Sequence, residues 1–309
     1  MEKKLRILED VLGGWYKTND EYLFYCPYCK HHKRKLSINI EKSAFKCWVC
    51  DVYGRNLQRI IRKFGSYQQR KEWEELTGKI DIAEFDSLFE EQSDDPEQLL
   101  RLPEEFESLA NNTHSLVSLP ARKYLQKRKV TKEDRLYWKI GFCASGEYSG
   151  RIIIPSFNED GYLNYFIART YKDNWKKYKN PAANRDIIYN DLCIDWTSDL
   201  TIVEGVFDAI VAGPNSIPLL GSSLRVGSRL FQKIVKNDTP VYIALDPDAD
   251  KKAMRLIKDL LIYGAQLYKV GIEPFSDVGE MAREEYKKRK EMAIPMTEDS
   301  FLLYQAMNL

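Results

Sequence analysis

Two pairs of cysteines near the N-terminus constrain the fold of this chain more than any other feature. Cys26 and Cys29 form one Cys-x2-Cys pair, Cys47 and Cys50 form a second, and 17 residues separate the two pairs. Each pair can direct two thiolates at one centre, so together they supply the four sulfur ligands of a tetrahedral structural Zn²⁺ site. A redox dithiol needs only one pair. We therefore expect a closed zinc site, one Zn²⁺ per chain, with the intervening residues forming a hairpin.

The segment around these cysteines is basic and rich in aromatic side chains. Residues 1–79 carry 17 Lys and Arg against 10 Asp and Glu, and Lys33, Arg34 and Lys35 lie between the two cysteine pairs. Basic groups neutralise phosphates, and aromatic faces stack on unpaired bases. The pattern predicts a zinc module that binds single-stranded nucleic acid through these three side chains. For each individual aromatic residue, a place in the hairpin core is the better interpretation.

The composition changes sharply after the zinc module. Residues 80–107 carry 11 acidic residues against one basic residue, which is typical of a linker. A globular pattern resumes after Leu119. We divide the chain into a zinc module (1–79), an acidic linker (80–118), a basic subdomain (119–198), an α/β subdomain (199–285) and a helical tail (286–309).

The two globular subdomains show different strand patterns. Residues 151–157 and 162–170 flank an Asn-Glu-Asp-Gly turn, which predicts an antiparallel hairpin. From residue 200 onwards, short apolar strands alternate with helices, and residues 250–264 place Met254 and Ile257 on one helical face. This alternation predicts an α/β fold with a largely parallel sheet.

Acidic residues follow the ends of neighbouring strands in the α/β subdomain. The candidate ligands are Glu204, Asp208, Asp246, Asp248, Asp250 and Asp277. The carboxyl ends of parallel strands meet at one edge of a sheet, and crowded carboxylates require a cation. Oxygen ligands at such a place suit Mg²⁺ or Mn²⁺, which bridge to substrate phosphates. Asp250 has a simpler interpretation as the cap of the following helix.

These motifs together resemble those of the bacterial and phage replicative DNA primases. The glutamate strand followed by Asp-x-Asp resembles the TOPRIM domain, and the cysteine spacing resembles the primase zinc ribbon. Further segments resemble the basic half of the primase polymerase core and its Leu-Gly-Thr turn. They are 150–155, Asp160–Gly161, Arg169, 177–181 and 220–223. The resemblance covers nearly the whole chain, and its all-cysteine ribbon is similar to the stand-alone phage form.

The resemblance implies a fold and an activity. The fold is a zinc ribbon, a linker, an α+β basic subdomain and a TOPRIM subdomain with a Rossmann-like parallel sheet. The activity is synthesis of short RNA primers on single-stranded DNA from NTPs. Glu204, Asp246 and Asp248 would be catalytic and hold Mg²⁺ or Mn²⁺, with Asp208 and Asp277 in support. Arg151, Arg169, Lys177 and Asn180 would contact the template or a nucleotide.

Two departures from the family pattern concern the metal site. The third acidic motif reads Asp277-Val278-Gly279, so that glycine stands where the family has a second acid. Asp250 has no counterpart in the family's Asp-x-Asp-x-Ala-Gly, and it could replace or supplement a usual ligand. Because Gly279 supplies no carboxylate, one metal would be held more weakly, unless Glu280 compensates for the missing acid.

Two classes of alternative remain open at this point. One is another TOPRIM enzyme, a nuclease or topoisomerase-like protein, and the other is a non-catalytic zinc-dependent nucleic-acid-binding protein. The sequence holds no Gly-x4-Gly-Lys-Ser/Thr phosphate loop, so by resemblance we expect a separate replicative helicase as partner. Without a long apolar run or a signal-peptide pattern, we expect no membrane association and a cytoplasmic location, in the host cytoplasm if the protein is viral.

Overall fold

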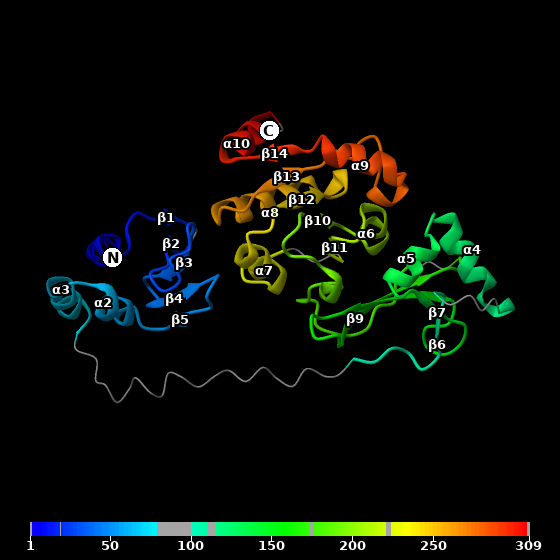
Figure 1. Ribbon diagram of the computed structural model, residues 1–309, viewed down its shortest axis with the longest axis horizontal. Coiled ribbons are helices and arrows are strands. Elements are labelled where there is room, and N and C mark those ends of the chain that lie inside the picture. The colour runs from blue at the N-terminus through cyan, green and yellow to red at the C-terminus, as the bar shows by residue number, and fades with distance from the viewer. Residues whose placement is uncertain are drawn as a thin grey trace. The chain divides into compact units, whose positions relative to one another are not determined.

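The computed structural model (Figure 1) describes residues 2–18, 20–78, 100–110, 115–173, 176–220 and 224–307. The chain forms two compact units, one built mainly from residues 1–97 and the other mainly from residues 98–309. Most of the predicted acidic linker lies outside the described residues. Among the helices of the described segments, none is both long and apolar enough to cross a membrane.

The first unit is a five-stranded antiparallel sheet with three helices. Its strands, in the order β1-β2-β3-β4-β5, are β1 (Tyr16–Lys17), β2 (Tyr22–Tyr25), β3 (Arg34–Asn39), β4 (Ala44–Cys47) and β5 (Tyr53–Gly54). Its helices are α1 (Glu2–Leu12), α2 (Gln58–Phe64) and α3 (Tyr67–Thr77). The pairing of β3 with β4 confirms the predicted hairpin, since Leu36 lies opposite Cys47 and Ile38 opposite Phe45.

One hydrophobic core joins the helices of this unit to its sheet. Phe24, Leu36 and Ile38 lie on one face of the sheet and are fully buried, because every second side chain of a strand points to the same face. They pack with Leu8 of α1 and Trp73 of α3 in a cluster that also includes Cys26 and Cys47. The cysteine centre is therefore continuous with the core of the unit.

The second unit begins with an antiparallel sheet in the order β6-β7-β8-β9. Its elements are β6 (Phe106–Ser108), η3 (Leu116–Ser118), α4 (Leu119–Lys127), α5 (Lys132–Tyr137), β7 (Gly141–Cys143), β8 (Arg151–Phe157), β9 (Leu163–Thr170) and η4 (Asp191–Cys193). The hairpin of β8 and β9 was predicted from the sequence. Strand β6 was not, because it lies in the acidic segment assigned to the linker, where Phe106 pairs with Cys143.

The second sheet of this unit is mostly parallel, in the order β11-β10-β12-β13-β14. Strand β14 runs antiparallel to β13 at one edge, and the other pairs are parallel. Its strands are β10 (Leu200–Val203), β11 (Ser216–Pro218), β12 (Val241–Ala244), β13 (Leu267–Lys269) and β14 (Ile294–Met296). The connecting elements are α6 (Val206–Ala212), α7 (Arg229–Asn237), η5 (Pro247–Ala249), α8 (Asp250–Ile262), η6 (Val278–Glu280), α9 (Arg283–Glu291) and α10 (Glu298–Met307). This confirms the predicted α/β fold.

Burial on both faces accounts for the largely apolar composition of β10. All four residues of β10 are buried, as expected for a strand covered on both faces. Met254 and Ile257 of α8 are buried as their helical spacing predicted. Because β10 and β12 are parallel neighbours, with Val203 opposite Ala244, the residues that follow both strands emerge at the same edge of the sheet.

Candidate zinc centre and acidic site

The four paired cysteines come from two turns of similar geometry. Cys26 follows β2, Cys47 ends β4, and each pair closes on a residue with positive φ, Lys30 at 52° or Asp51 at 55°. The chain can reverse its direction there, directly after the second cysteine of each pair. Backbone bonds hold the turns, since the Lys30 N–H donates to the Cys26 carbonyl at 2.9 Å.

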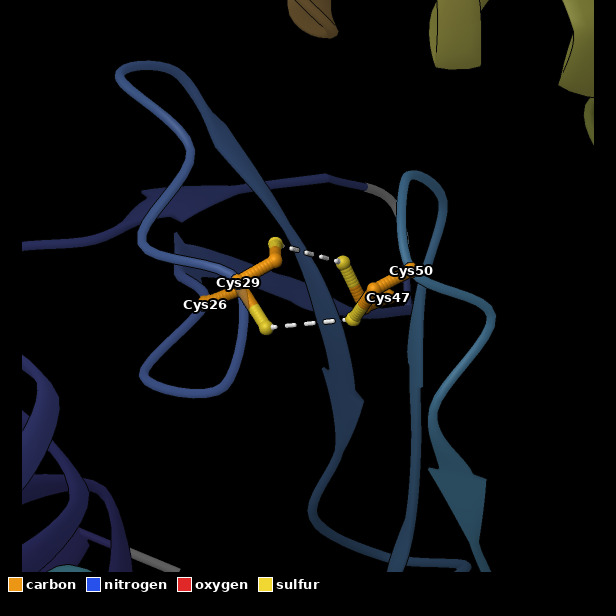
Figure 2. A group of neighbouring side chains, drawn as sticks. All are labelled: Cys26, Cys29, Cys47 and Cys50. Carbon is orange, nitrogen blue, oxygen red and sulfur yellow. Dashed lines mark hydrogen bonds between the residues drawn. The ribbon is translucent and has the colours of Figure 1, made fainter.

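Figure 2 shows the four sulfur atoms facing one point between the turns. The Sγ atoms of Cys26 and Cys50 are 3.8 Å apart, as are those of Cys29 and Cys47, and all four lie within 4.8 Å of one another. A tetrahedron with metal–sulfur bonds of about 2.3 Å has edges of about 3.8 Å. The sulfur positions therefore fit a four-coordinate Zn²⁺, as the sequence predicted.

The electrostatics of the thiols agree with a cation at this point. The neighbouring Cys26 side chain and burial raise the pKa of the Cys47 thiol well above its usual range. Burial likewise raises the pKa of the Cys29 thiol. Four crowded thiolates are unfavourable without a positive charge, and Zn²⁺ binding deprotonates its thiol ligands outright.

The basic residues between the cysteine pairs have different surroundings. The Arg34 guanidinium lies 4.6 Å from the ring centres of both Tyr16 and Tyr25, and its Nε donates to the Gly14 carbonyl. Arg34 is therefore part of the packing between β1, β2 and β3. Lys33 precedes β3, and Lys35 lies within it, where its carbonyl accepts from the Trp48 N–H.

The acidic site forms at the carboxyl edge of the parallel sheet. Glu204 directly follows β10, Asp246 follows β12 by two residues, and Asp248 lies in η5. One carboxylate oxygen from each of these three residues lies within 4.8 Å of the others. The structure thus brings together three of the six acids that the sequence singled out.

The surroundings of Asp246 make its carboxyl group costly to ionise. Burial, followed by the negative charges of Asp208, Glu204, Asp277 and Asp248, raises its pKa to about 7. Its Oδ1 atom is buried, and none of the described residues gives it a hydrogen bond. A buried carboxylate oxygen without a donor is costly unless a cation coordinates it. The donor set of three carboxylates and this orphaned oxygen together fit a hard divalent cation.

Asp208 lies beside the cluster but is held by backbone groups. It is 8% exposed, and it accepts the N–H groups of Gly205 at 2.8 Å and Gly279 at 2.9 Å. Burial raises its pKa to about 6, and the charge of Asp277 acts in the same direction, while the two N–H groups oppose the shift. Asp277 caps η6 by accepting the Glu280 N–H at 2.9 Å. These two acids act on the cluster through their charge.

Gly279 explains the missing acid of the third motif. A Cβ at this position would lie 2.9 Å from Asp208 Oδ1 and 3.2 Å from Asp277 Oδ1. Glycine therefore allows η6 to approach α6 closely enough for its N–H to reach Asp208. A side chain at position 279 would displace one of these two carboxylates.

Asp250 has partners outside the acidic cluster. Its Oδ1 accepts the Tyr304 hydroxyl at 3.1 Å and pairs with Lys269 Nζ at 3.2 Å. These contacts connect the first turn of α8 to β13 and α10. The sequence could not separate this role from metal binding, because the residues that receive the Asp250 side chain lie 19 and 54 positions further along the chain.

The predicted basic residues of the antiparallel sheet divide into buried and accessible groups. Arg151 is 6% exposed and donates to the carbonyls of Ala168 and Lys176 at 3.2 and 3.1 Å. The Asn180 side chain accepts the Ala168 N–H at 3.2 Å. Both residues therefore hold the end of β9 in place, and Arg151 offers little surface to a ligand.

Arg169 and Lys177 are more open. Arg169 donates to the Tyr124 hydroxyl at 3.1 Å and lies 4.8 Å from the Tyr178 ring centre, whereas Lys177 is exposed. The Leu-Gly-Thr-like turn has only Leu220 within the described residues, and its N–H donates to the Glu204 carbonyl at 3.0 Å. Residues 221–223 of that turn lie outside the described part of the chain.

A pocket of about 580 Å³ in the second unit is lined in part by Leu220. Leu220 connects its wall to the acidic site, and the charged side chains of the lining are Arg185, Arg225 and Asp186. This volume lies in the range of small-molecule sites. No sequence pattern predicted the pocket, because its lining comes from separate segments, 184–187, 217–220 and 224–228, and from Leu230.

One residue of the acidic site was not predicted from sequence. Lys252 Nζ pairs with Glu204 Oε1 at 3.0 Å. The only available signal was a pair of lysines directly after the Asp-x-Asp-x-Asp run, in the first turn of a predicted helix.

Comparison with known proteins gives structural relatives only. No protein-family model matches the sequence, and no curated protein matches it. Among solved structures, a DnaG primase catalytic domain bound to ssDNA is 20% identical with a TM-score of 0.54, covering 63% of this chain and 77% of its own. The Escherichia coli primase catalytic core is 19% identical with a TM-score of 0.52, covering 63% and 79%. The RNA polymerase domain of Mycobacterium tuberculosis primase is 15% identical with a TM-score of 0.50, covering 60% and 80%.

The architecture of these relatives answers the question of fold. The chain resembles bacterial primases, and it shares its fold with their catalytic domains.

Proposed function

We propose that this protein is a DNA primase, which synthesises short RNA primers on single-stranded DNA from NTPs. The observation that carries this proposal is the convergence of Glu204, Asp246 and Asp248 at the edge of a parallel sheet within a chain that has the fold of primase catalytic domains. Fold alone does not define chemistry. The acidic cluster supplies the chemistry that nucleotidyl transfer needs.

The reaction joins two nucleotides on a template. The 3′-hydroxyl oxygen of one nucleotide forms a bond to the α-phosphorus of the next, the bond from that phosphorus to the bridging oxygen breaks, and pyrophosphate leaves. The hydroxyl proton passes to water. Mg²⁺ or Mn²⁺ bound here would activate the hydroxyl and neutralise the charge on the pyrophosphate.

The residues of this chain would divide that work between them. Glu204, Asp246 and Asp248 would hold the metal, while Asp208 and Asp277 set the negative field around it. The adjoining pocket, whose lining includes Arg185, Arg225 and the oppositely charged Asp186, has the size to receive part of a nucleotide. Arg169 and Lys177 would contact the phosphates of the template or nucleotide.

The zinc module would recognise the template. Residues 1–79 carry 17 Lys and Arg against 10 Asp and Glu, which favours contact with phosphates. One structural relative, a primase catalytic domain, is described as bound to ssDNA, which supports DNA binding by the second unit. Because the sequence contains no phosphate loop for an ATP-driven motor, a separate helicase would open the duplex. We therefore include single-stranded DNA, NTPs and a helicase among the proposed partners.

A primer-synthesis assay tests this function. The protein is incubated with single-stranded DNA templates, labelled NTPs and Mg²⁺, with and without helicase, and short RNA products are expected. Asp246→Asn and Glu204→Gln should each reduce synthesis by about 10³-fold or more, while the affinity for DNA stays near that of the unchanged protein. Asp299→Asn, which neutralises an exposed acid of α10, is the matched control.

The outcomes separate the alternatives. Absence of RNA products on every template would refute the primase proposal. Nicking or relaxation of DNA would favour a nuclease or topoisomerase-like activity. Full synthesis by either acidic variant would refute the assignment of the metal site.

A further inference from the structure

The acidic cluster contains a positive charge supplied by the chain itself. Lys252 lies in the first turn of α8, and its Nζ is 3.0 Å from Glu204 Oε1. The two side chains are equally half-buried, each 28% exposed. They are separated by 48 positions in sequence, so the fold of the parallel sheet creates this ion pair.

The ion pair and a bound metal would compete for the same carboxylate. The Glu204 carboxylate that meets Lys252 is also one of the three carboxylates that each place an oxygen within 4.8 Å of the others. A divalent cation binds such oxygens at about 2.1 Å. It would then lie close to the ammonium group, and two cations in a partly buried site repel strongly.

Once it leaves Glu204, the ammonium group of Lys252 could bind the phosphates of a nucleotide. A nucleoside triphosphate brings about four negative charges to the metal, because these cations bridge to substrate phosphates. Lysine carries a compact charge on a flexible four-carbon stem and binds phosphate as a point charge. Once released from Glu204, the Lys252 ammonium group would pair with those phosphates.

We propose that Lys252 is a built-in counter-ion of the acidic cluster, which a divalent metal displaces from Glu204 and which then binds the triphosphate of the incoming nucleotide. This inference rests on the proposed nucleotidyl transfer for its second step. It assigns Lys252 as a residue that couples metal binding to nucleotide binding: the lysine opposes the metal before the nucleotide arrives and favours the nucleotide afterwards.

Metal binding tests the first step without any turnover. Mn²⁺ affinity is measured by electron paramagnetic resonance on the full chain with zinc present and with no DNA or nucleotide. Lys252→Gln should bind Mn²⁺ about fivefold more tightly than Lys251→Gln. Lys251 is the adjacent, exposed lysine, so its variant removes the same charge from the same turn and corrects for the general electrostatic effect.

A conservative variant, and the direction of the expected change in Mn²⁺ affinity, distinguish the proposed effect from misfolding. Lys252→Arg keeps the charge, and its Mn²⁺ affinity should return to within about twofold of the unchanged protein. A misfolded variant would lose Mn²⁺ binding, whereas the proposal requires tighter binding. Equal Mn²⁺ affinities for Lys252→Gln and Lys251→Gln would overturn the proposal.

Nucleotide binding tests the second step. Equilibrium dialysis with labelled ATP at saturating Mg²⁺ should give a Kd about tenfold higher for Lys252→Gln than for Lys251→Gln. An unchanged Kd for ATP would also overturn the proposal. Neither measurement depends on primer synthesis, so a failure of the proposed primase activity and a failure of this inference would be distinguished.

Discussion

The chemistry of the acidic site depends on individual carboxyl groups whose surroundings differ. Glu204 has a lysine partner at 3.0 Å, Asp208 has two backbone N–H donors, and the buried oxygen of Asp246 has no donor among the described residues. Ionising Asp246 is therefore the least favourable of the three. A divalent cation would relieve that cost, which makes Asp246 the residue that most strongly links metal binding to pH.

We predict that Mn²⁺ affinity rises with pH between about 6 and 8. The pKa of Asp246 is raised to about 7 and that of Asp208 to about 6, and a carboxylate must lose its proton before it coordinates a metal. Titration calorimetry at pH 6.5, in buffers of different ionisation enthalpy, should show proton release on Mn²⁺ binding. The release should disappear by pH 8.5, and release that is independent of pH would contradict the prediction.

The same shifts have a consequence for stability. Both groups have a folded-state pKa above the value in the unfolded chain, so the folded state keeps protons that the unfolded chain releases near pH 4. The contribution of Asp246 to stability therefore falls as pH rises from about 4 to about 7, when no divalent metal is present. Addition of Mn²⁺ or Mg²⁺ above pH 7 should restore the lost stability.

Gly279 gives a second prediction at this scale. Gly279→Asp would restore the acid found in the resembling family motif, but its Cβ would meet Asp208 Oδ1 at 2.9 Å. We expect the free energy of unfolding to fall by about 1–3 kcal/mol, with no gain in Mn²⁺ affinity. Gly271→Ala, whose Cβ meets no atom within 4 Å, is the control in a denaturant titration. Tighter Mn²⁺ binding by Gly279→Asp would show that this position can still accept a metal ligand.

At the scale of whole elements, the sequence predicted the structure wherever a local pattern determined it. The hairpin of β8 and β9, the parallel strands β10 and β12, and the helix α8 follow from alternation, apolar runs and helical spacing. Strand β6 escaped prediction because its three residues, Phe-Glu-Ser, carry almost no alternating pattern. Its pairing with β7 depends on a partner 37 residues later, where Phe106 lies opposite Cys143 in the sheet and contacts its core.

The candidate site shows the same division. Glu204, Asp246 and Asp248 were predictable because strand ends fix their positions. The partners of Arg151 and Asp250 were not predictable, since a long basic side chain and an acid in the first turn of a helix find their partners only after the elements have packed. The Glu204–Lys252 ion pair likewise joins a strand end to a helix that sequence spacing alone does not place.

The contacts of Asp250 lead to a prediction about α8 and α10. Asp250→Asn removes the charge that pairs with Lys269 and weakens the bond from Tyr304. Because the ion pair is partly exposed, we expect a loss of only about 0.5–1 kcal/mol in the free energy of unfolding. Primer synthesis should fall far less than in Asp246→Asn. Comparable losses of primer synthesis in Asp250→Asn and Asp246→Asn would indicate that Asp250 is a metal ligand.

At the scale of the whole molecule, the two units depend on different sources of stability. The second unit has two sheets and many fully buried side chains, such as Ile153, Ile202 and Ile243. The first unit is smaller, with its main described segments at residues 2–18 and 20–78, and its core includes two of the four cysteine ligands. Small units of this kind commonly need a metal to complete their folding free energy.

We therefore predict that removal of zinc unfolds the first unit and leaves the second intact. Elemental analysis of the reduced, untreated protein should give about one zinc per chain. A zinc-selective chelator should then increase amide hydrogen exchange in the segments 22–26, 34–39 and 44–47, which carry the cysteine centre. Exchange in β10 and β12 should stay unchanged, because the hydrogen bonds between these strands involve no zinc ligand.

Cys47→Ser should reproduce the exchange pattern of the chelated protein without any chelator, since Cys47 is both a proposed ligand and a buried core residue. Cys143→Ser is the matched control, because this buried cysteine lies outside the centre and belongs to the core of the second unit. Protection that survived chelation in β3 and β4 would show that the hydrophobic core of the first unit holds its fold without the metal.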